Sequence, residues 1–466
     1  MPDVSTQTAP AHERSEGTVN PALRIFKVPP TDISINAYRM VTIQPTTTGI
    51  NPMEFIIPGL DDFVDLGRSY FTMELSLKKE DAGNLVANQK LWPVNNLAHS
   101  IIKQIDLQLN GTLISPQSDT YHYKAYLETL LNYDREDGKT VLGPQGWFNQ
   151  VDFPPQWTAT NTDKAGDHAH WNALSDNQKG ALDAMVAEVA KYAGGATHSL
   201  VFTPHLEVFH TGKLLVPGIE IKMKFHFNGP SLFLNGVALA GRLMEGDVKL
   251  RFHLCQLRLN DAIYQSISSK RHNEGEVAAY PTVRSEIRTF SMQGNLVRFD
   301  IPNLFQNRIP DRLIVGLLDS RAFNGDVTRD PFCFQKFGLT SIKQIVKGEE
   351  YPYETLQLVH NNGTRDNLGY FRFLQASGAW CKKKGNMVEL LDWGQAKNCT
   401  LYMFDNVANG CADSQNLNPK QTGDLQLVLE FGAAPGVNIT VLVYGEFENL
   451  LEIDRNGAVL YNIYQH

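Results

Sequence analysis

Apolar and polar residues alternate along many short segments of this 466-residue chain, which is the pattern of strands that bury one face. The alternation is clearest in residues 221–227 (IKMKFHF) and again in residues 425–431 (LQLVLEF). Asn-Gly pairs, which favour tight hairpin turns, separate several of these segments. These pairs begin at Asn110, Asn235, Asn324, Asn362 and Asn456. Short strands joined by tight turns predict a β-sandwich or barrel and not a fold of alternating strands and helices.

Two sequence motifs occur twice, in the same order. The pattern F-x-I-P-x-L is found at residues 55–60 and again at 299–304, an offset of 244 residues. The pattern I-K-Q-I is found at residues 102–105 and 342–345, an offset of 240. Ordered repeats at a nearly constant spacing indicate an internal duplication. The sequence therefore predicts two barrels with the same order of strands.

The spacing between the two copies shrinks toward their ends. The strand expected at residues 248–254 matches residues 439–445 at an offset of only 191, so the first copy carries 49 more residues than the second. We place these residues within 134–200, a polar stretch that contains three tryptophans. A helix is predicted near 175–193, with Ser175 as its N-cap. We expect this insertion to lie outside the framework of the barrel.

These observations predict an all-β chain of two tandem jelly-roll barrels, a double jelly roll, with a partly helical insertion in the first. The first barrel is expected at residues 31–265, including the insertion at 134–200, and the second at 285–466, with a linker at 266–284 between them. Residues 1–30 are rich in Thr, Ser, Ala and Pro and have no apolar stretch of the kind found in signal peptides. We expect them to form a mobile N-terminal arm.

Charge and hydropathy exclude two classes of partner. The net charge is −8 and the isoelectric point is about 5.9, so no broad basic surface for direct, sequence-specific nucleic acid binding is expected. No run of 18 or more apolar residues occurs, which predicts no transmembrane segment. The five cysteines include no C-x-x-C pair and are odd in number. Without a signal peptide, they are expected to be reduced thiols, several of them buried.

The sequence shows no phosphate-binding loop, dinucleotide fingerprint, nucleophile elbow or zinc-protease motif. The nearest approach to a metal site is a group of histidines with one glutamate: His168, His170, His205, Glu207 and His210. His205 and Glu207 would share a face of a strand, but a closed metal site needs three or four converging ligands. We expect the pair to form the polar face of a strand whose Leu206 and Val208 face the core.

The other candidate residues also have structural interpretations. His226 and His253 each lie between apolar neighbours on an alternating strand, which predicts that they point outward. Cys381 is followed by three lysines, which could lower the pKa of a thiol, but a charged turn at the end of a strand explains the cluster. No catalytic, cofactor-binding or metal-binding residue is therefore predicted, and no cofactor.

One helix stands out in the first copy. Its apolar residues share one face, which would pack on its own barrel or, as an alternative, on a neighbouring molecule. These residues are Tyr123, Tyr126, Leu127, Leu130 and Leu131.

The duplicated strand plan resembles the double jelly-roll major capsid proteins of the adenovirus and tectivirus lineage. More narrowly, several segments resemble the capsid-type proteins of Polinton/Maverick elements and adintovirus-like genomes. They are residues 93–100 (PVNNLAHS), 109–111 (LNG), 121–131 (YHYKAYLETLL), 310–319 (PDRLIVGLLD), 322–325 (AFNG) and 330–332 (DPF). The resemblance covers most of residues 35–460, and neither the insertion nor the N-terminal arm takes part in it.

This resemblance implies a structural major capsid protein and not an enzyme. Three copies around a threefold axis would place six barrels in a ring, giving a pseudo-hexagonal homotrimeric capsomer that tiles an icosahedral shell. The partners implied are other copies of the chain together with penton and minor capsid proteins. The implied location is the virion, after synthesis in the host cytoplasm.

Two other interpretations remain open. A tandem β-sandwich that binds or processes carbohydrate could use the tryptophans of the insertion, although no acid/base pair of carboxylates is marked in the sequence. A penton or minor capsid protein is the second alternative, but such proteins are usually single jelly rolls.

Overall fold

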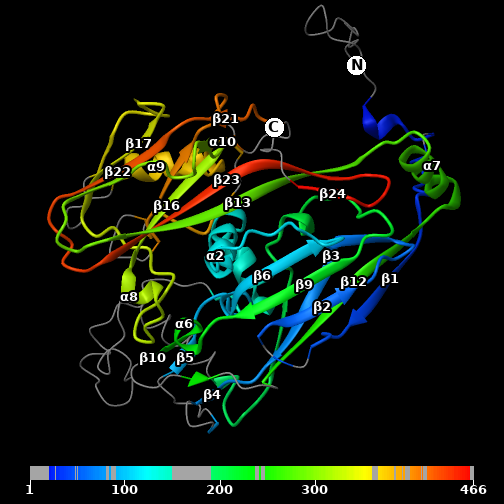
Figure 1. Cartoon of the computed structure of the whole chain (residues 1–466), viewed down its shortest axis with the longest axis horizontal. Coiled ribbons are helices and arrows are strands. Elements are labelled where there is room, and N and C mark those ends of the chain that lie inside the picture. The colour runs from blue at the N-terminus through cyan, green and yellow to red at the C-terminus, as the bar shows by residue number, and fades with distance from the viewer. Residues whose placement is uncertain are drawn as a thin grey trace, which may run out of the picture.

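The computed structural model describes residues 20–461 apart from positions 27, 48, 50, 80–82, 85–90, 149–189, 237–240, 243–246, 359–365, 383–384, 391, 394–398, 411 and 413–416. Two β-barrels lie side by side (Figure 1). Most of the arm expected at residues 1–30 falls outside the described residues, and its described part contains one turn of 3-10 helix, Pro21–Leu23.

The first barrel consists of two antiparallel sheets. One has the order β1-β12-β3-β8 and the other the order β2-β9-β6-β7. The strands of the first sheet are β1 (Ile35–Ile43), β12 (Val248–Leu259), β3 (Phe63–Leu75) and β8 (His198–Phe202). Those of the second are β2 (Met53–Ile57), β9 (Ile221–Phe227), β6 (Ile102–Leu109) and β7 (Thr112–Leu113).

The second barrel repeats this plan, with sheet orders β13-β23-β16-β20 and β14-β22-β17-β18. Its first sheet contains β13 (Ala278–Met292), β23 (Ile439–Ile453), β16 (Arg312–Asp319) and β20 (Leu401–Asp405), with β24 (Val459–Leu460) paired to β23. Its second sheet contains β14 (Arg298–Ile301), β22 (Leu425–Phe431), β17 (Leu339–Val346) and β18 (Glu349–Glu350), with β19 (Leu356–Gln357) paired to β17.

Short elements decorate the barrels. Three two-stranded sheets pair β4 (Lys78–Lys79) with β11 (Gly241–Arg242), β5 (Leu91–Pro93) with β10 (Leu234–Gly236), and β15 (Arg308–Ile309) with β21 (Gln421–Thr422). The helices are α1 (Leu97–Ser100), α2 (Tyr121–Asn132), α3 (Arg135–Lys139), α6 (Pro230–Phe233), α7 (Asp261–His272), α8 (Ser320–Phe323), α9 (Asn367–Ala376) and α10 (Ala379–Lys382).

The duplication read from the sequence is confirmed at the level of strands. The two F-x-I-P-x-L motifs begin in β2 and β14, and the two I-K-Q-I motifs lie in β6 and β17, which hold the same places in their sheets. The register between neighbouring strands is not conserved. Phe227 lies opposite Ile102, whereas Phe431 lies opposite Leu339, three residues before Ile342. Each barrel has a β-bulge next to this phenylalanine pair, between Ile102 and Gln104 in the first and between Leu339 and Ser341 in the second. A bulge adds an unpaired residue to one strand, so the residue pairing differs between the barrels while the order of strands is the same.

The insertion expected at 134–200 is not separate from the barrel, and that expectation is wrong at both of its ends. Leu142 and Trp147 are buried in the core at one end, and Leu200 belongs to β8, which pairs with β3, at the other. A difference between repeat offsets gives the length of an insertion but not its boundaries. The helix expected near 175–193 lies outside the described residues except for its last four positions.

The linker expected at residues 266–284 contains the second half of α7, a short connection and the first residues of β13. The division into two barrels that we propose therefore has its connection at residues 273–277. One continuous hydrophobic cluster runs through both barrels and includes residues as far apart as Phe55 and Phe447. The two barrels are consequently packed as one body within the chain.

Candidate assembly surfaces

Helix α2 lies at the junction of the two barrels (Figure 1), and ten of its twelve residues are buried. The ring of Tyr126 stacks on Phe332 of the second barrel with their centroids 4.2 Å apart. Tyr123 stacks on Phe323, which belongs to α8, at 5.5 Å. The helix predicted from the apolar face of residues 121–131 therefore packs on its own barrel and on the second barrel of the same chain.

A charged cluster stands at the centre of this junction, around Glu128. Its Oε2 lies 2.7 Å from Nδ1 of His205, and its Oε1 accepts a hydrogen bond of 3.0 Å from the hydroxyl of Tyr444. The ammonium group of Lys124, one helical turn earlier, is 3.8 Å away. Burial alone would raise the pKa of Glu128, but the charge of Lys124 and the bond to His205 outweigh it and lower the pKa to about 2. Glu128 is therefore ionised at neutral pH.

Sequence reasoning missed Glu128 and Lys124. A signal was present, because an i, i+4 pair of opposite charges stands within a helix that is otherwise apolar on this side. What the sequence could not indicate was the partner, since Tyr444 follows 316 residues later.

The structure places the histidines and the glutamate considered for a metal site differently from our expectation. Residues 207–209 form a 3-10 helix and not a strand, and His205 is buried together with Leu206 and Val208. Both ring nitrogens of His205 have contacts, because Nε2 lies 3.4 Å from Thr129 Oγ1 and Nδ1 faces Glu128. His168 and His170 lie outside the described residues. Within the described part of the chain, no group of three or more His, Cys, Asp or Glu residues could hold a metal ion.

A cleft of about 470 Å³ opens beside the Glu128 cluster. Its polar lining comes from both barrels and includes Lys124, Glu128, Glu207, Arg312, Glu446 and Glu448. Burial raises the pKa of Glu207, in contrast to that of Glu128. Two carboxyl groups with opposite shifts are a pattern used in acid–base catalysis. Here each carboxyl has a side-chain partner from elsewhere in the fold, because the hydroxyl of Tyr461 bonds to Glu207. This arrangement favours a structural role at the junction.

The connection between β8 and β9 covers β13 on the other side of the cleft. The hydroxyl of Tyr280 accepts a hydrogen bond from the backbone N–H of Val216 and donates one to the carbonyl of Leu214, both at 3.1 Å. The ammonium group of Lys213 donates to the carbonyl of Ala279 at 2.8 Å. The first barrel therefore contacts the edge strand of the second barrel as well as its interior.

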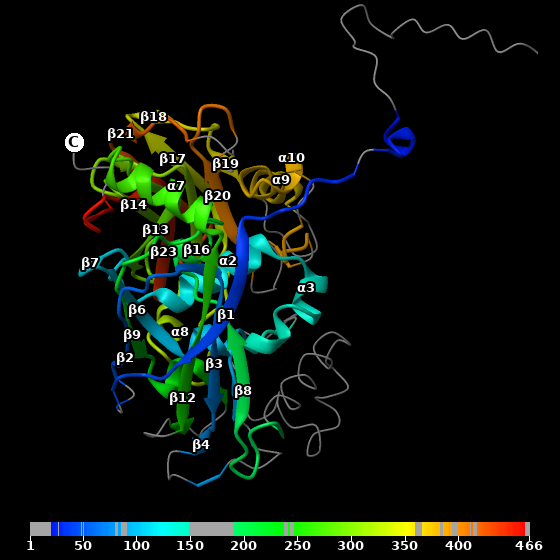
Figure 2. The ribbon, with the colours of Figure 1, turned by 90° about the vertical axis from the view of Figure 1, so that its right-hand side faces the viewer.

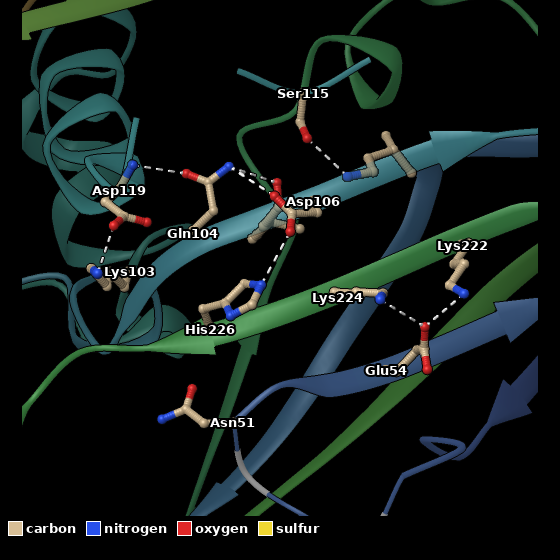
Figure 3. Close-up of polar contacts among 12 residues, drawn as sticks. Asn51, Glu54, Lys103, Gln104, Asp106, Ser115, Asp119, Lys222, Lys224 and His226 are labelled. Carbon is tan, nitrogen blue, oxygen red and sulfur yellow. Dashed lines mark hydrogen bonds and ion pairs between the residues drawn. The ribbon is translucent and has the colours of Figure 1, made fainter. Parts of the chain in front are cut away.

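The outer face of the sheet formed by β2, β9 and β6 is polar (Figure 3). Glu54 on β2 pairs with Lys222 at 2.9 Å and with Lys224 at 3.5 Å, both on β9. The hydrogen bond from Lys222, together with the charge of Lys224, lowers the pKa of Glu54 despite its partial burial. His226 lies 3.1 Å from Asp106 on β6. The prediction that His226 points outward is confirmed, and cross-strand pairs of opposite charge stabilise this face.

The remaining candidates from the sequence are His253 and the cysteines. His253 lies on the outer side of β12, where its ring nitrogens contact Thr42 and Thr72. Cys255, Cys333 and Cys399 are free thiols, and burial raises the pKa of Cys399 to about 12. The side chain of Cys381 is not among those described.

The exposed apolar side chains of the described surface include two sets that bear on assembly. The first precedes and includes β1: Leu23, Ile25, Phe26, Val28, Ile33, Ile35, Tyr38 and Met40. The second is on α9 and α10, where Leu368 is 54% exposed and Trp380 is 58% exposed. Exposed apolar groups of this kind are typical of surfaces that contact another protein.

No family model matches the sequence. One curated relative, an uncharacterized protein of Caenorhabditis elegans, is 24% identical over 454 residues, which are 92% of this chain and 98% of that protein. The fold is similar to that of the Sputnik virophage structure, with a TM-score of 0.57, 9% identity, and coverage of 98% of this chain and 95% of that one.

Two further structures are similar over nearly their whole length. The mavirus major capsid protein has a TM-score of 0.55 and 10% identity, with 98% of this chain and 97% of that one covered. A chain of the PBCV-1 virus capsid has a TM-score of 0.53 and 12% identity, with 95% and 100% covered. The protein therefore has the double jelly-roll fold of viral major capsid proteins, which confirms the predicted fold class. Among the described residues, no helix has the length and apolar character needed to cross a membrane.

Proposed function

We propose that this protein is a structural major capsid protein that assembles into homotrimeric, pseudo-hexagonal capsomers. The observation that carries the proposal is the presence of two barrels with the same sheet order, packed together by α2 within one chain. Two equivalent barrels per chain turn a threefold ring of chains into a nearly sixfold ring of barrels. Such a block can tile a closed shell in which six neighbours surround it.

Further support comes from the similar solved structures of viral capsids, whose likeness extends over 95% or more of this chain. The full-length relative in a nematode is in keeping with the Polinton/Maverick-like capsid genes of invertebrates that the sequence resembles. On this proposal the partners are other copies of the chain, penton proteins and minor capsid proteins, the location is the virion, and the protein is not an enzyme.

A carbohydrate-processing β-sandwich is the runner-up, and the cleft near Glu128 would be its site. This alternative is weaker because Glu128 and Glu207 each accept a hydrogen bond from a tyrosine of the second barrel's end of the chain, Tyr444 and Tyr461, which is the arrangement of a structural contact. A penton or minor capsid protein would usually have one jelly roll, whereas this chain has two.

The test is the mass of the purified full-length chain by light scattering, followed by electron microscopy of concentrated samples. We expect a particle of three times the 52.2 kDa chain mass with a six-lobed outline. A chain that remains monomeric at high concentration, or one that hydrolyses glycans in a panel of substrates, would contradict the proposal.

A further inference from the structure

The two barrels differ in how the first sheet of each is covered. In the second barrel all eight residues of β16 are buried, and so are residues 439–445 of β23. Neighbouring residues on a strand point to opposite faces, so both faces of this sheet are covered along these two strands. One face meets the core of its own barrel, and part of the other meets the first barrel, where Tyr444 bonds to Glu128.

The corresponding sheet of the first barrel is covered on one face only. Burial alternates along β12 and along the second half of β3, as expected for strands with one face toward solvent. Polar contacts cross this outer face, where Arg251 pairs with Glu74 at 2.6 Å and the rings of Tyr70 and His253 stack at 4.7 Å. The sheet therefore has no partner within the described chain comparable to the one that its counterpart has.

Strand β1 is the edge of this uncovered sheet, and none of its nine residues is buried. Thr42 hydrogen-bonds to His253 and so lies on the outer face, and by alternation Tyr38 and Met40 share that side. Tyr38 is 68% exposed. The strand faces the viewer in Figure 2, on the side of the first barrel that is turned away from the second barrel in Figure 1.

Helices α2 and α9 show the matching contrast. Along the chain, α2 lies between β7 and β8, and α9 lies between β19 and β20. Because β8 and β20 are the fourth strands of their sheets, the two helices hold the same place in the two copies. Ten of the twelve residues of α2 are buried against the second barrel and its own, whereas three of the ten residues of α9 are buried. Leu368 on α9 and Trp380 on α10 are more than half exposed.

We propose that the outer face of the sheet β1-β12-β3-β8 is the surface onto which the α9–α10 side of a second copy docks. Contact between chains would then repeat, in the same head-to-tail sense, the contact between the two barrels of one chain. This inference rests on the proposed trimer, since a head-to-tail contact of this kind closes after three chains and six barrels.

The chemistry of the two faces fits this assignment. The face covered within the chain has buried apolar residues on the side of Tyr444, among them Ile314, Leu318 and Leu442, next to the charged cluster around Glu128. The face assigned to the second copy combines exposed Tyr38 and Met40 with charged and hydroxyl groups. A mixed surface of this kind allows a chain to fold alone, remain soluble and then associate.

The test uses two substitutions in the full-length chain, Tyr38→Glu on the sheet and Trp380→Glu on the helix side. Both side chains are more than half exposed, so each variant should keep the circular dichroism spectrum and melting temperature of the wild type. Val297→Glu, at a position that is 53% exposed and outside the proposed contact, is the matched control and should assemble like the wild type.

Sedimentation velocity then separates the possible outcomes. We expect each variant alone to be monomeric, because every contact needs an intact sheet on one copy and an intact helix side on the next. An equimolar mixture should form a one-to-one dimer, in which the intact helix side of the Tyr38→Glu chain binds the intact sheet of the Trp380→Glu chain. A single variant that stays trimeric, or a mixture that stays monomeric, would overturn the docking inference while the proposed capsid function stands. A wild-type chain that is itself monomeric would instead overturn the proposed function.

Discussion

The hydroxyl of Tyr444 in the second barrel donates a 3.0 Å hydrogen bond to the carboxylate of Glu128 in the first. This bond joins the central strand of one barrel to the helix of the other, and it belongs to a cluster that also contains Lys124 and His205. Breaking a buried ion pair by removing one partner leaves the other charge without compensation. The cluster is therefore a point at which the packing of the two barrels depends on ionisation.

The substitution Glu128→Gln should lower the free energy of unfolding by about 2–4 kcal/mol at pH 7, since it removes the negative charge that compensates the buried ammonium group of Lys124. The pKa of Glu128 is about 2 in the fold against an ordinary value of 4.5, so its stabilising effect is present above pH 4.5 and is lost as the pH falls toward 2. Urea unfolding at pH 7 and at pH 3 measures both effects.

The matched control is Tyr444→Phe, which removes one hydrogen bond and keeps the charges. It should lower the free energy of unfolding by about 1 kcal/mol. The difference between the wild type and Glu128→Gln should shrink at pH 3, and an equal difference at both pH values would show that the carboxylate charge has no role.

Asp311 shows the opposite dependence on pH. Burial raises the pKa of its carboxyl to about 6, and the charges of Glu448 and Glu446 add to this effect against a hydrogen bond from the backbone N–H of Glu448. Ionisation therefore costs more in the folded chain than in the unfolded one. Stability at this site is highest when Asp311 is protonated and falls as the pH rises from about 4 to about 6.

The substitution Asp311→Asn should consequently stabilise the protein above pH 6 and leave it unchanged below pH 4. We expect a gain of about 1 kcal/mol at pH 7.5, a value reduced for the solvent that reaches this partly exposed carboxyl. Melting temperatures measured between pH 3.5 and 8 would test this. The exposed Glu354→Gln serves as the control and should follow the wild-type profile at every pH.

The strands and their duplication could be predicted from the sequence because each depends on local patterns. The I-K-Q-I motif shows a physical reason for its repetition. Gln104 and Gln344 are both buried. The side-chain amide of each donates a hydrogen bond to a carbonyl in the segment that follows its hairpin, that of Pro116 for Gln104 and that of Tyr351 for Gln344. A glutamine at this place closes the same turn in both barrels.

The junction could not be predicted from the sequence, although one signal pointed to it. The strand at 313–318 is a continuous apolar run, whereas its counterpart at 71–75 alternates. A continuous run on a short strand is typical of burial on both faces, which indicates that something covers the outside of the second barrel. The pattern does not say that the covering element is α2, because pairing at a distance of more than 200 residues leaves no local signal.

Phe332 is the residue through which we test the packing of α2 against the second barrel. Its side chain is 1% exposed, stacks on Tyr126 at 4.2 Å and meets the edge of Tyr123 at 5.6 Å. The substitution Phe332→Ala should lower the free energy of unfolding by about 3–5 kcal/mol, because it removes a large buried ring and leaves a cavity. Since that cavity borders α2, amide hydrogen exchange in α2 should accelerate more than exchange in the strands of either barrel.

Phe305→Ala is the matched control, since this ring is equally buried but contacts Phe447 inside the second barrel. The Phe305→Ala variant should lose a similar free energy of unfolding, and its amide hydrogen exchange should accelerate no more in α2 than in the rest of the chain. Equal acceleration of α2 in both variants would show that the helix is not held in place by its stacking on Phe332.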